Sequence, residues 1–115
     1  MATYVNNLRL KEIATGDEAG TWGTSTNTNL ELIGEAFAYG TEALADSSTQ
    51  TITMADATAD GIRKMFVKLT GTLSQASTVT IAPDTVSKVW IIENATSGGY
   101  NTVIKQGSGA TVTIP

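Results

Sequence analysis

Apolar and polar residues alternate along most of the second half of the chain, and this period of two is typical of half-buried β-strands. Short turns rich in Gly, Asp and Ser separate the alternating runs, as expected for hairpin loops. Residues 49–115 are therefore predicted to form a small antiparallel β-sandwich or barrel-like domain. Since the last run reaches Pro115 without a turn, we expect the natural protein to continue beyond it. The runs occupy residues 49–54, 62–70, 78–81, 87–94, 100–106 and 110–114.

A period of three to four residues precedes the strands and predicts a helix over residues 28–45. Thr28 and Glu31 have the spacing of a capping box, in which each side chain accepts a backbone N–H group of the first turn. The positions that share one helical face form an a/d seam of two heptads, which suits either the chain's own sheet or identical helices of other subunits. These seam positions are Leu30, Ile33, Phe37, Gly40 and Leu44.

Residues 1–27 are predicted to be an extended arm that ends in a glycine-rich loop around Trp22. Trp22 either fills the core of its own domain or anchors the loop to a larger assembly. In the second interpretation, four apolar side chains of this segment dock on another protein. They are Leu8, Leu10, Ile13 and Trp22. The expected fold class is thus α+β and mainly β, with an arm, one short helix and a β domain.

The absence of cysteine and histidine removes several kinds of chemistry from this chain of 115 residues. Disulfides, thiolate metal sites, cysteine nucleophiles and histidine general bases are all excluded. The eleven carboxylates have no metal-ligand spacing, although a pair that is assembled only in space stays open. We therefore expect no catalytic residue, no metal and no cofactor, and a protein that is not an enzyme.

Charge and hydropathy narrow the partners further. The net charge is −4, and the acidic residues concentrate in the first half of the chain, so there is no basic footprint for nucleic acid. No run approaches the roughly 20 apolar residues that would insert in a membrane. The first residues also lack the charged and apolar regions of a signal peptide, which predicts synthesis in a cytoplasm without export.

Two segments carry a resemblance to a known class of proteins. Asn7 to Ile13, followed by Gly20-Thr21-Trp22-Gly23 with trailing Thr and Asn, resembles the amino-terminal virion-attachment region of tail-fibre and tail-appendage proteins of tailed bacteriophages. Lys88 to Tyr100 is similar to the β-rich part of the same proteins. The resemblance implies a homotrimeric structural protein of the viral tail, assembled in the host cytoplasm, whose partners are its own copies and other phage tail proteins.

Three function classes follow. The first is the amino-terminal module of a homotrimeric tail fibre, which attaches the fibre to the tail and supports host adsorption; in it, the helix seam is the trimer seam. The second is a carbohydrate- or receptor-binding β domain of a virion, for which Trp90 and Tyr100 offer stacking surfaces. If the chain is instead the attachment module, any host glycan is bound by the distal part of the natural protein. The third is a fragment of a virion-bound depolymerase.

Overall fold

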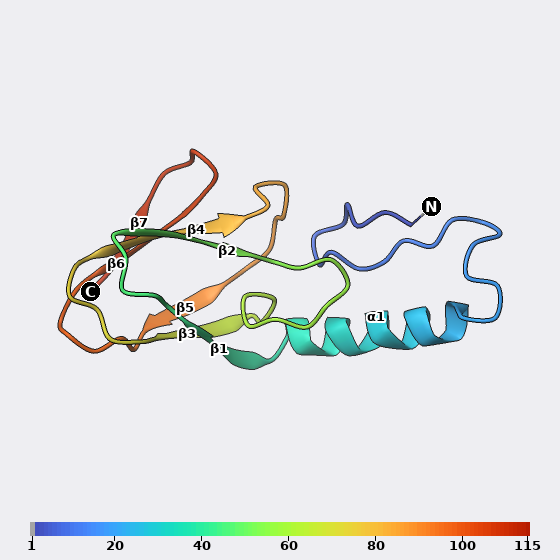
Figure 1. Ribbon diagram of the computed structural model, residues 1–115, viewed down its shortest axis with the longest axis horizontal. Helices are drawn as coiled ribbons and strands as arrows, with labels where there is room; N and C mark the ends of the chain where they lie inside the picture. Colours follow the sequence, from blue (N-terminus) through green and yellow to red (C-terminus); the bar gives the residue numbers. More distant parts are fainter. Residues whose placement is uncertain (1) are drawn as a thin grey trace.

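The computed structural model describes residues 2–115, and in this range one helix precedes seven strands (Figure 1). The expectation of a mainly β chain with one helix is confirmed. The strands form two open sheets that do not close into a barrel. The elements are α1 (Trp22–Ala36), β1 (Tyr39–Ala43), β2 (Thr49–Thr53), β3 (Phe66–Thr70), β4 (Ser77–Ala82), β5 (Ile91–Asn94), β6 (Thr102–Gln106) and β7 (Val112–Ile114).

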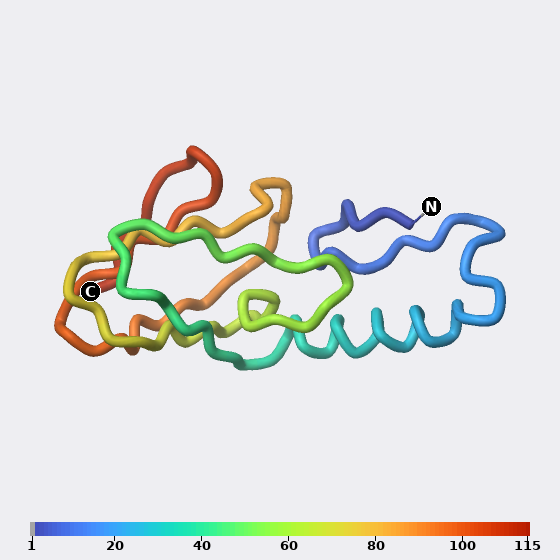
Figure 2. Tube along the Cα trace, viewed as in Figure 1, coloured from blue at the N-terminus to red at the C-terminus, as the bar shows by residue number. Residues whose placement is uncertain are grey.

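From β1 to β6, consecutive strands alternate between the two sheets. One sheet has the order β1-β3-β5 and the other β2-β4-β6-β7. The chain therefore winds back and forth between two layers, and each turn of the winding contributes one strand to each sheet (Figure 2). We call these turns coil 1 (β1 and β2), coil 2 (β3 and β4) and coil 3 (β5 and β6). The coils pair in parallel, whereas β7 pairs with β6 in the antiparallel sense.

The prediction of an antiparallel β domain was thus wrong. The short segments after β1, β3 and β5 have the length of hairpin loops, but they carry the chain into the opposite sheet instead of reversing it within one sheet. Parallel neighbours need a long crossover between them. Here the crossover includes a strand of the other sheet. Phe66 of coil 2 pairs with Ile91 of coil 3, and Ser77 with Thr102, so both strands repeat after 25 residues.

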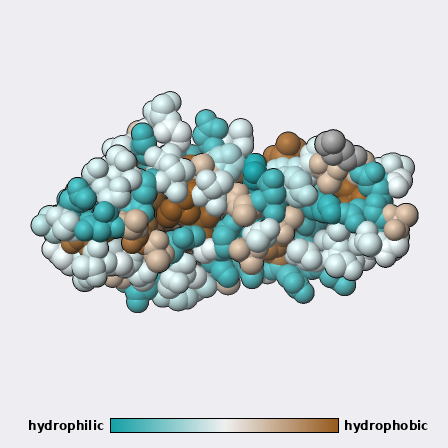
Figure 3. Space-filling model, in the orientation of Figure 1, coloured by the Kyte–Doolittle hydropathy of each residue, from teal (hydrophilic) through white to brown (hydrophobic). Residues whose placement is uncertain are grey.

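The core lies between the sheets, where side chains of successive coils stack. Val67 is in register with Ile92 in one sheet, and Val79 with Ile104 in the other. Figure 3 shows a hydrophobic band between the two layers, bordered by hydrophilic residues. Val67, Leu69, Val79 and Ile81 of coil 2 are each at most 3% exposed, as expected for strands that are covered on both edges and one face. The buried apolar residues of this cluster are Leu44, Met54, Ile62, Val67, Leu69, Leu73, Val79, Ile81 and Val86.

The helix also differs from its predicted bounds of 28–45. It begins at Trp22, six residues earlier, because a turn at Glu18 starts it: the Trp22 N–H donates to the Glu18 carbonyl at 2.9 Å, and the Glu18 carboxylate accepts the Ser25 hydroxyl at 3.2 Å. Thr28 lies inside the helix and caps nothing. The helix ends at Ala36, since Tyr39–Ala43 form β1 and hydrogen-bond to β3 instead.

The helix extends away from the sheets, and the amino-terminal arm returns beside it (Figure 1). The molecule is consequently long, with principal extents of 52 × 25 × 21 Å. The Asn29 side chain holds the arm by exchanging two hydrogen bonds with the backbone of Lys11, at 3.0 and 2.9 Å. The Ala57 N–H donates to the Arg9 carbonyl at 2.7 Å, and the Arg9 guanidinium pairs with Asp56. The expected extended arm is therefore folded against its own chain.

The loop between β2 and β3 packs on coil 1 and buries an arginine. The Arg63 side chain is fully buried, and its Nη2 donates to the carbonyls of Ala55 at 2.7 Å and Thr58 at 3.0 Å. Asp60 lies 3.8 Å from Nη2 and accepts the backbone N–H groups of Ala55 and Arg63. Burial lowers the pKa of the Arg63 guanidinium, and Asp60 opposes that effect. Arg63 thus acts as the hydrogen-bonding centre of this loop.

The Arg63→Ala substitution is expected to lower the free energy of unfolding by about 3 kcal/mol, because it leaves a cavity, two carbonyls without donors and an unpaired Asp60. Arg63→Met keeps most of the volume and should cost less, about 1–2 kcal/mol. Urea denaturation followed by circular dichroism measures both. The exposed Glu31→Ala serves as the control, with a change within about 0.5 kcal/mol. An Arg63→Ala value as small as that of the control contradicts the assigned role.

Glu42 gives a pH-dependent test of the same region. Its carboxylate accepts the Ile62 N–H at 2.8 Å, and burial raises the pKa of this carboxyl above its ordinary value, with the nearby charge of Asp60 adding to the rise. A raised carboxyl pKa means that the folded chain binds the proton more tightly, so stability falls as the pH rises from the unfolded to the folded pKa. Glu42→Gln keeps an acceptor oxygen and should lose this fall, so its stability relative to the wild type should increase as the pH rises above the ordinary carboxyl pKa. Parallel urea titrations at several pH values check this. Identical pH profiles for the two proteins would count against it.

Candidate functional site

One face of the helix carries large apolar side chains that its own chain leaves uncovered. Trp22 is 62% exposed, Leu30 61%, Ile33 37% and Phe37, the residue that caps the helix, 72%. The helix meets its own chain with a different face, on which Leu32 and Ala36 are buried. This helix therefore has two apolar faces. We call the uncovered one, formed by Trp22, Leu30, Ile33 and Phe37, the helix stripe.

The helix stripe is narrow and straight. At 3.6 residues per turn, its four residues fall within an arc of about 80°, and at 1.5 Å per residue it runs the full length of roughly 22 Å. Leu30, Ile33 and Phe37 step by three and four residues, which is the spacing of a coiled-coil seam, whereas Trp22 lies eight residues before Leu30 and is one residue off that repeat. The position of Trp22 on this helix face follows from the sequence at 3.6 residues per turn. It was missed because the glycine-rich segment around Trp22 was interpreted as a loop.

No charged side chain interrupts the helix stripe. Thr26 lies within its arc, and the neighbouring positions Gly23 and Gly34 have open space around them, since an added Cβ at either would meet no atom within 4 Å. Glu31 and Glu35 lie on other faces, and Glu35 is 3.9 Å from Lys64 of its own chain. A surface without charge and with small neighbours allows another helix to approach closely.

Two of the five predicted seam residues lie elsewhere. Gly40 belongs to β1, and Leu44, which is 7% exposed, lies in the core between the sheets. The seam prediction was wrong at both positions because the chain turns from helix to strand after Ala36. Leu30, Ile33 and Phe37 do share one exposed face. The interpretation in which this face covers the chain's own sheet does not agree with their exposure.

The four predicted docking residues are divided between two places. Leu8, Leu10 and Ile13 are half-buried by their own chain in the returning arm. Trp22 was predicted to lie in a loop. It is instead the first residue of α1 and belongs to the helix stripe. The alternative in which Trp22 fills its own core is excluded by its 62% exposure. Trp22 therefore lies on the same face of the helix as Leu30, Ile33 and Phe37.

The carboxylates of the described residues 2–115 do not assemble a metal site: no group of three or more His, Cys, Asp or Glu is placed to hold an ion. Glu42 and Asp60 interact electrostatically, but both accept backbone N–H groups that hold the loop between β2 and β3. Asp46 likewise accepts the backbone and hydroxyl groups of Ser74, which lowers the pKa of its carboxyl. These carboxylates have structural partners.

Trp90, one of the two aromatic residues offered as a sugar-stacking surface, is occupied by contacts within its own chain, whereas Tyr100 is 42% exposed. Trp90 packs partly buried against the core, and its indole N–H donates to the Ile62 carbonyl at 2.8 Å. The ammonium of Lys88 lies 4.8 Å from the centre of its ring, a cation–π distance. Burial lowers the pKa of Lys88. Trp90 therefore has a core role, and one of its faces is covered by a cation.

In residues 2–115 no helix combines the length and the hydropathy that crossing a bilayer requires. Comparisons of the chain with protein-family models, with curated proteins and with solved structures found no match.

Proposed function

We propose that this chain is a structural module of a bacteriophage virion, the amino-terminal part of a homotrimeric tail fibre or tail appendage that attaches the fibre to the tail and supports host adsorption. The helix stripe carries the proposal, since it is an apolar surface that a separate monomer would leave in water. The resemblance of the segments around Trp22 and Trp90 to tail-fibre proteins supplies the biological setting. The site of action is then the virion tail.

The size of the helix stripe fits association between copies. An aromatic side chain buries on the order of 150–250 Å² when it is fully covered, so Trp22 and Phe37, each more than half exposed, are costly to leave in water. A specific interface needs roughly 800 Å² from each partner. One helix face supplies only part of that area. In a trimer each subunit meets two neighbours, and the sheets next to the helix add further contacts.

Three identical helices also agree with the charge of the surface. Because the helix stripe has no charged residue, copies of a chain with net charge −4 can bring it together without repulsion at the contact. Parallel helices around one axis give a fibre a single direction, which a module that joins a tail to a distal part requires. We place the parallel contact at Leu30, Ile33 and Phe37, and the contact with the tail at Trp22 and the arm.

The other two function classes find no supporting observation. A carbohydrate-binding surface needs exposed aromatic faces in one groove, whereas the face of Trp90 is covered by Lys88. A depolymerase needs two free carboxylates across a cleft, whereas Glu42 and Asp60 hold backbone N–H groups. We therefore expect no polysaccharide cleavage by this chain.

Replacing Ile33 and Phe37 together with Asp is expected to weaken the trimer on the order of 100-fold or more, because it buries unpaired charge in the contact. Size-exclusion chromatography with light scattering should show a trimer for the wild type and a monomer for the variant. The Thr24→Asp, Asn27→Asp variant is the matched control. It adds the same two charges to the same helix outside the stripe, so it should stay trimeric.

Circular dichroism must show the same helix content in all three proteins, which separates dissociation from unfolding. A folded wild-type monomer at tens of micromolar would refute the trimer, and so would an unchanged trimer in the Ile33→Asp, Phe37→Asp variant.

The attachment role predicts which residues meet the tail. In a map of the assembled particle, Leu8, Leu10, Ile13 and Trp22 should lose solvent exposure to another chain, with Trp22 changing most because it starts at 62% exposure. Trp22→Ala should reduce incorporation of the chain into particles at least tenfold, whereas Trp22→Phe should retain most of it. If the map leaves these four side chains covered only by their own subunit, the attachment role of this segment fails.

A further inference from the structure

The sheet formed by β1, β3 and β5 ends in an open edge at coil 3. In the other sheet β7 turns back and covers β6, but β5 has a neighbour on one side only, β3. The N–H groups of Ile91 and Ala95 donate to carbonyls of the β3 side, at 2.7 and 2.9 Å. Because alternate backbone groups of a strand point to opposite edges, Ile92 and Asn94 direct theirs to the open edge.

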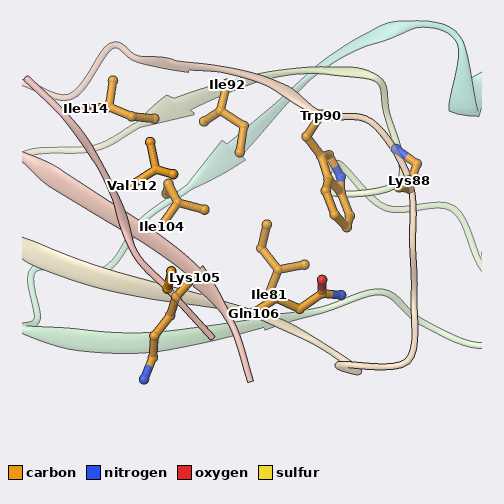
Figure 4. Close-up of a pocket in the computed structure, with 10 residues that line it drawn as sticks. Ile81, Lys88, Trp90, Ile92, Ile104, Lys105, Gln106, Val112 and Ile114 are labelled. Carbon is orange, nitrogen blue, oxygen red and sulfur yellow. The ribbon is translucent and has the colours of Figure 1, made fainter. Parts of the chain in front are cut away.

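A groove of about 550 Å³ lies beside this edge. Figure 4 shows that Ile92 and Trp90 face the side chains of the opposite layer across it, while Lys105 extends away from it. The groove is the space that the interior of a further coil would fill. Its apolar lining is made by Ile81, Trp90, Ile92, Ile104, Val112 and Ile114.

The far wall of the groove is held in place from β5. The Asn94 carboxamide donates to the carbonyl of Ile114 at 3.2 Å and to that of Tyr100 at 3.1 Å. These bonds join the end of β7 to the end of β5, so the two layers are fixed relative to one another at coil 3. The groove is therefore preformed, and a ligand does not have to separate the sheets to enter it.

The charges on the outer face of the sheet indicate which charge is favoured on a strand that pairs with the open edge of β5. Along the row that crosses the strands, Lys68 of β3 is in register with Glu93 of β5. Opposite charges in register stabilise neighbouring strands, and like charges destabilise them. The position that follows Glu93 across the open edge therefore favours Lys or Arg. The position beside Ile92 favours an aliphatic side chain, because it faces the groove.

We infer that the β5 edge and its groove bind an extended polypeptide segment that adds a strand parallel to β5, with an aliphatic residue opposite Ile92 and a basic residue opposite Glu93. Backbone hydrogen bonds to Ile92 and Asn94 supply the affinity, and the groove and Glu93 supply the specificity. The sheet already grows in this way from coil 1 to coil 3, since β3 and β5 each add in parallel to the preceding strand.

Charge argues against an outermost strand of a second copy as the donor of this strand. The outermost strands of the two sheets are β1, β2, β5 and β7, and none of them contains Lys or Arg. In β1 the charged residue is Glu42, whose carboxylate accepts an N–H group of its own chain. The occupant is therefore a segment other than these four strands, one in which a basic residue follows an aliphatic one. This surface does not include the helix stripe, so the inference about the β5 edge is tested independently of the trimer.

A capped synthetic peptide with the sequence of residues 64–72 is the probe, because in the chain this segment holds Phe66, Val67 and Lys68 in register with β5. Added to the 115-residue protein, it should slow hydrogen exchange of the Ile92 and Asn94 amides at least tenfold, as measured by NMR. A nitroxide on its amino end should broaden the signals near Val89 more than those near Ala95, as parallel pairing requires.

Three matched comparisons decide the mechanism. A peptide with Glu in place of its central Lys should bind about fivefold more weakly to the wild type. The Glu93→Gln variant, which changes an exposed side chain, should bind both peptides equally. A peptide that is N-methylated at the amides facing β5 keeps the side chains and should lose binding at least tenfold.

Several results would overturn the inference. They are an unchanged Lys preference in Glu93→Gln, equal binding of the N-methylated peptide, and no protection of Ile92 and Asn94 at a millimolar concentration of peptide. Protection of the same amides without peptide, rising with protein concentration, would instead assign the edge to a second copy.

Discussion

Parallel, in-register pairing between strands of successive coils is the constraint on which the rest of the structure depends. Because β1 pairs with β3, and β3 with β5, every connecting segment must cross to the other sheet and return. Side chains such as Val67 and Ile92 consequently stack along the coils and form the core. The same winding leaves the stack of coils with two ends, coil 1 and coil 3. The loop with Arg63 packs on coil 1, whereas coil 3 keeps one open edge.

The strands themselves could be predicted from the sequence, but their pairing could not. The alternation in residues 62–70 agrees with the burial of Val67 and Leu69 on one face, because a period of two is the same in every kind of sheet. Nothing in that period distinguishes a parallel from an antiparallel neighbour. The repeat of 25 residues between Phe66 and Ile91 was the available signal. The long loop before β3 obscured it, since Tyr39 and Phe66 are 27 residues apart.

At both ends of the helix, the local sequence pattern predicts a different boundary from the one that hydrogen bonding and strand pairing produce. Thr28 and Glu31 satisfy the rule for a capping box, yet the hydrogen bonds at Glu18 start the helix earlier. Residues 37–44 fit a helical period and a strand period equally well. The pairing of Tyr39–Ala43 with β3 decides between them, and it also moves Leu44 into the core. The seam prediction identified the exposed face at Leu30, Ile33 and Phe37, where the helical period holds. It failed at the positions after the helix, where the chain forms β1.

The two uncovered surfaces differ in the kind of partner that they can accept. The helix stripe has no charge, so a copy of itself meets no electrostatic penalty there, and its apolar area rewards any helix of the same spacing. At the β5 edge, Glu93 stands next to Lys68 and leaves a position that favours a basic residue. The strands of this chain that have an open edge lack such a residue. With the two proposed partners, charge would therefore separate association between copies at the helix stripe from association with another segment at the sheet edge.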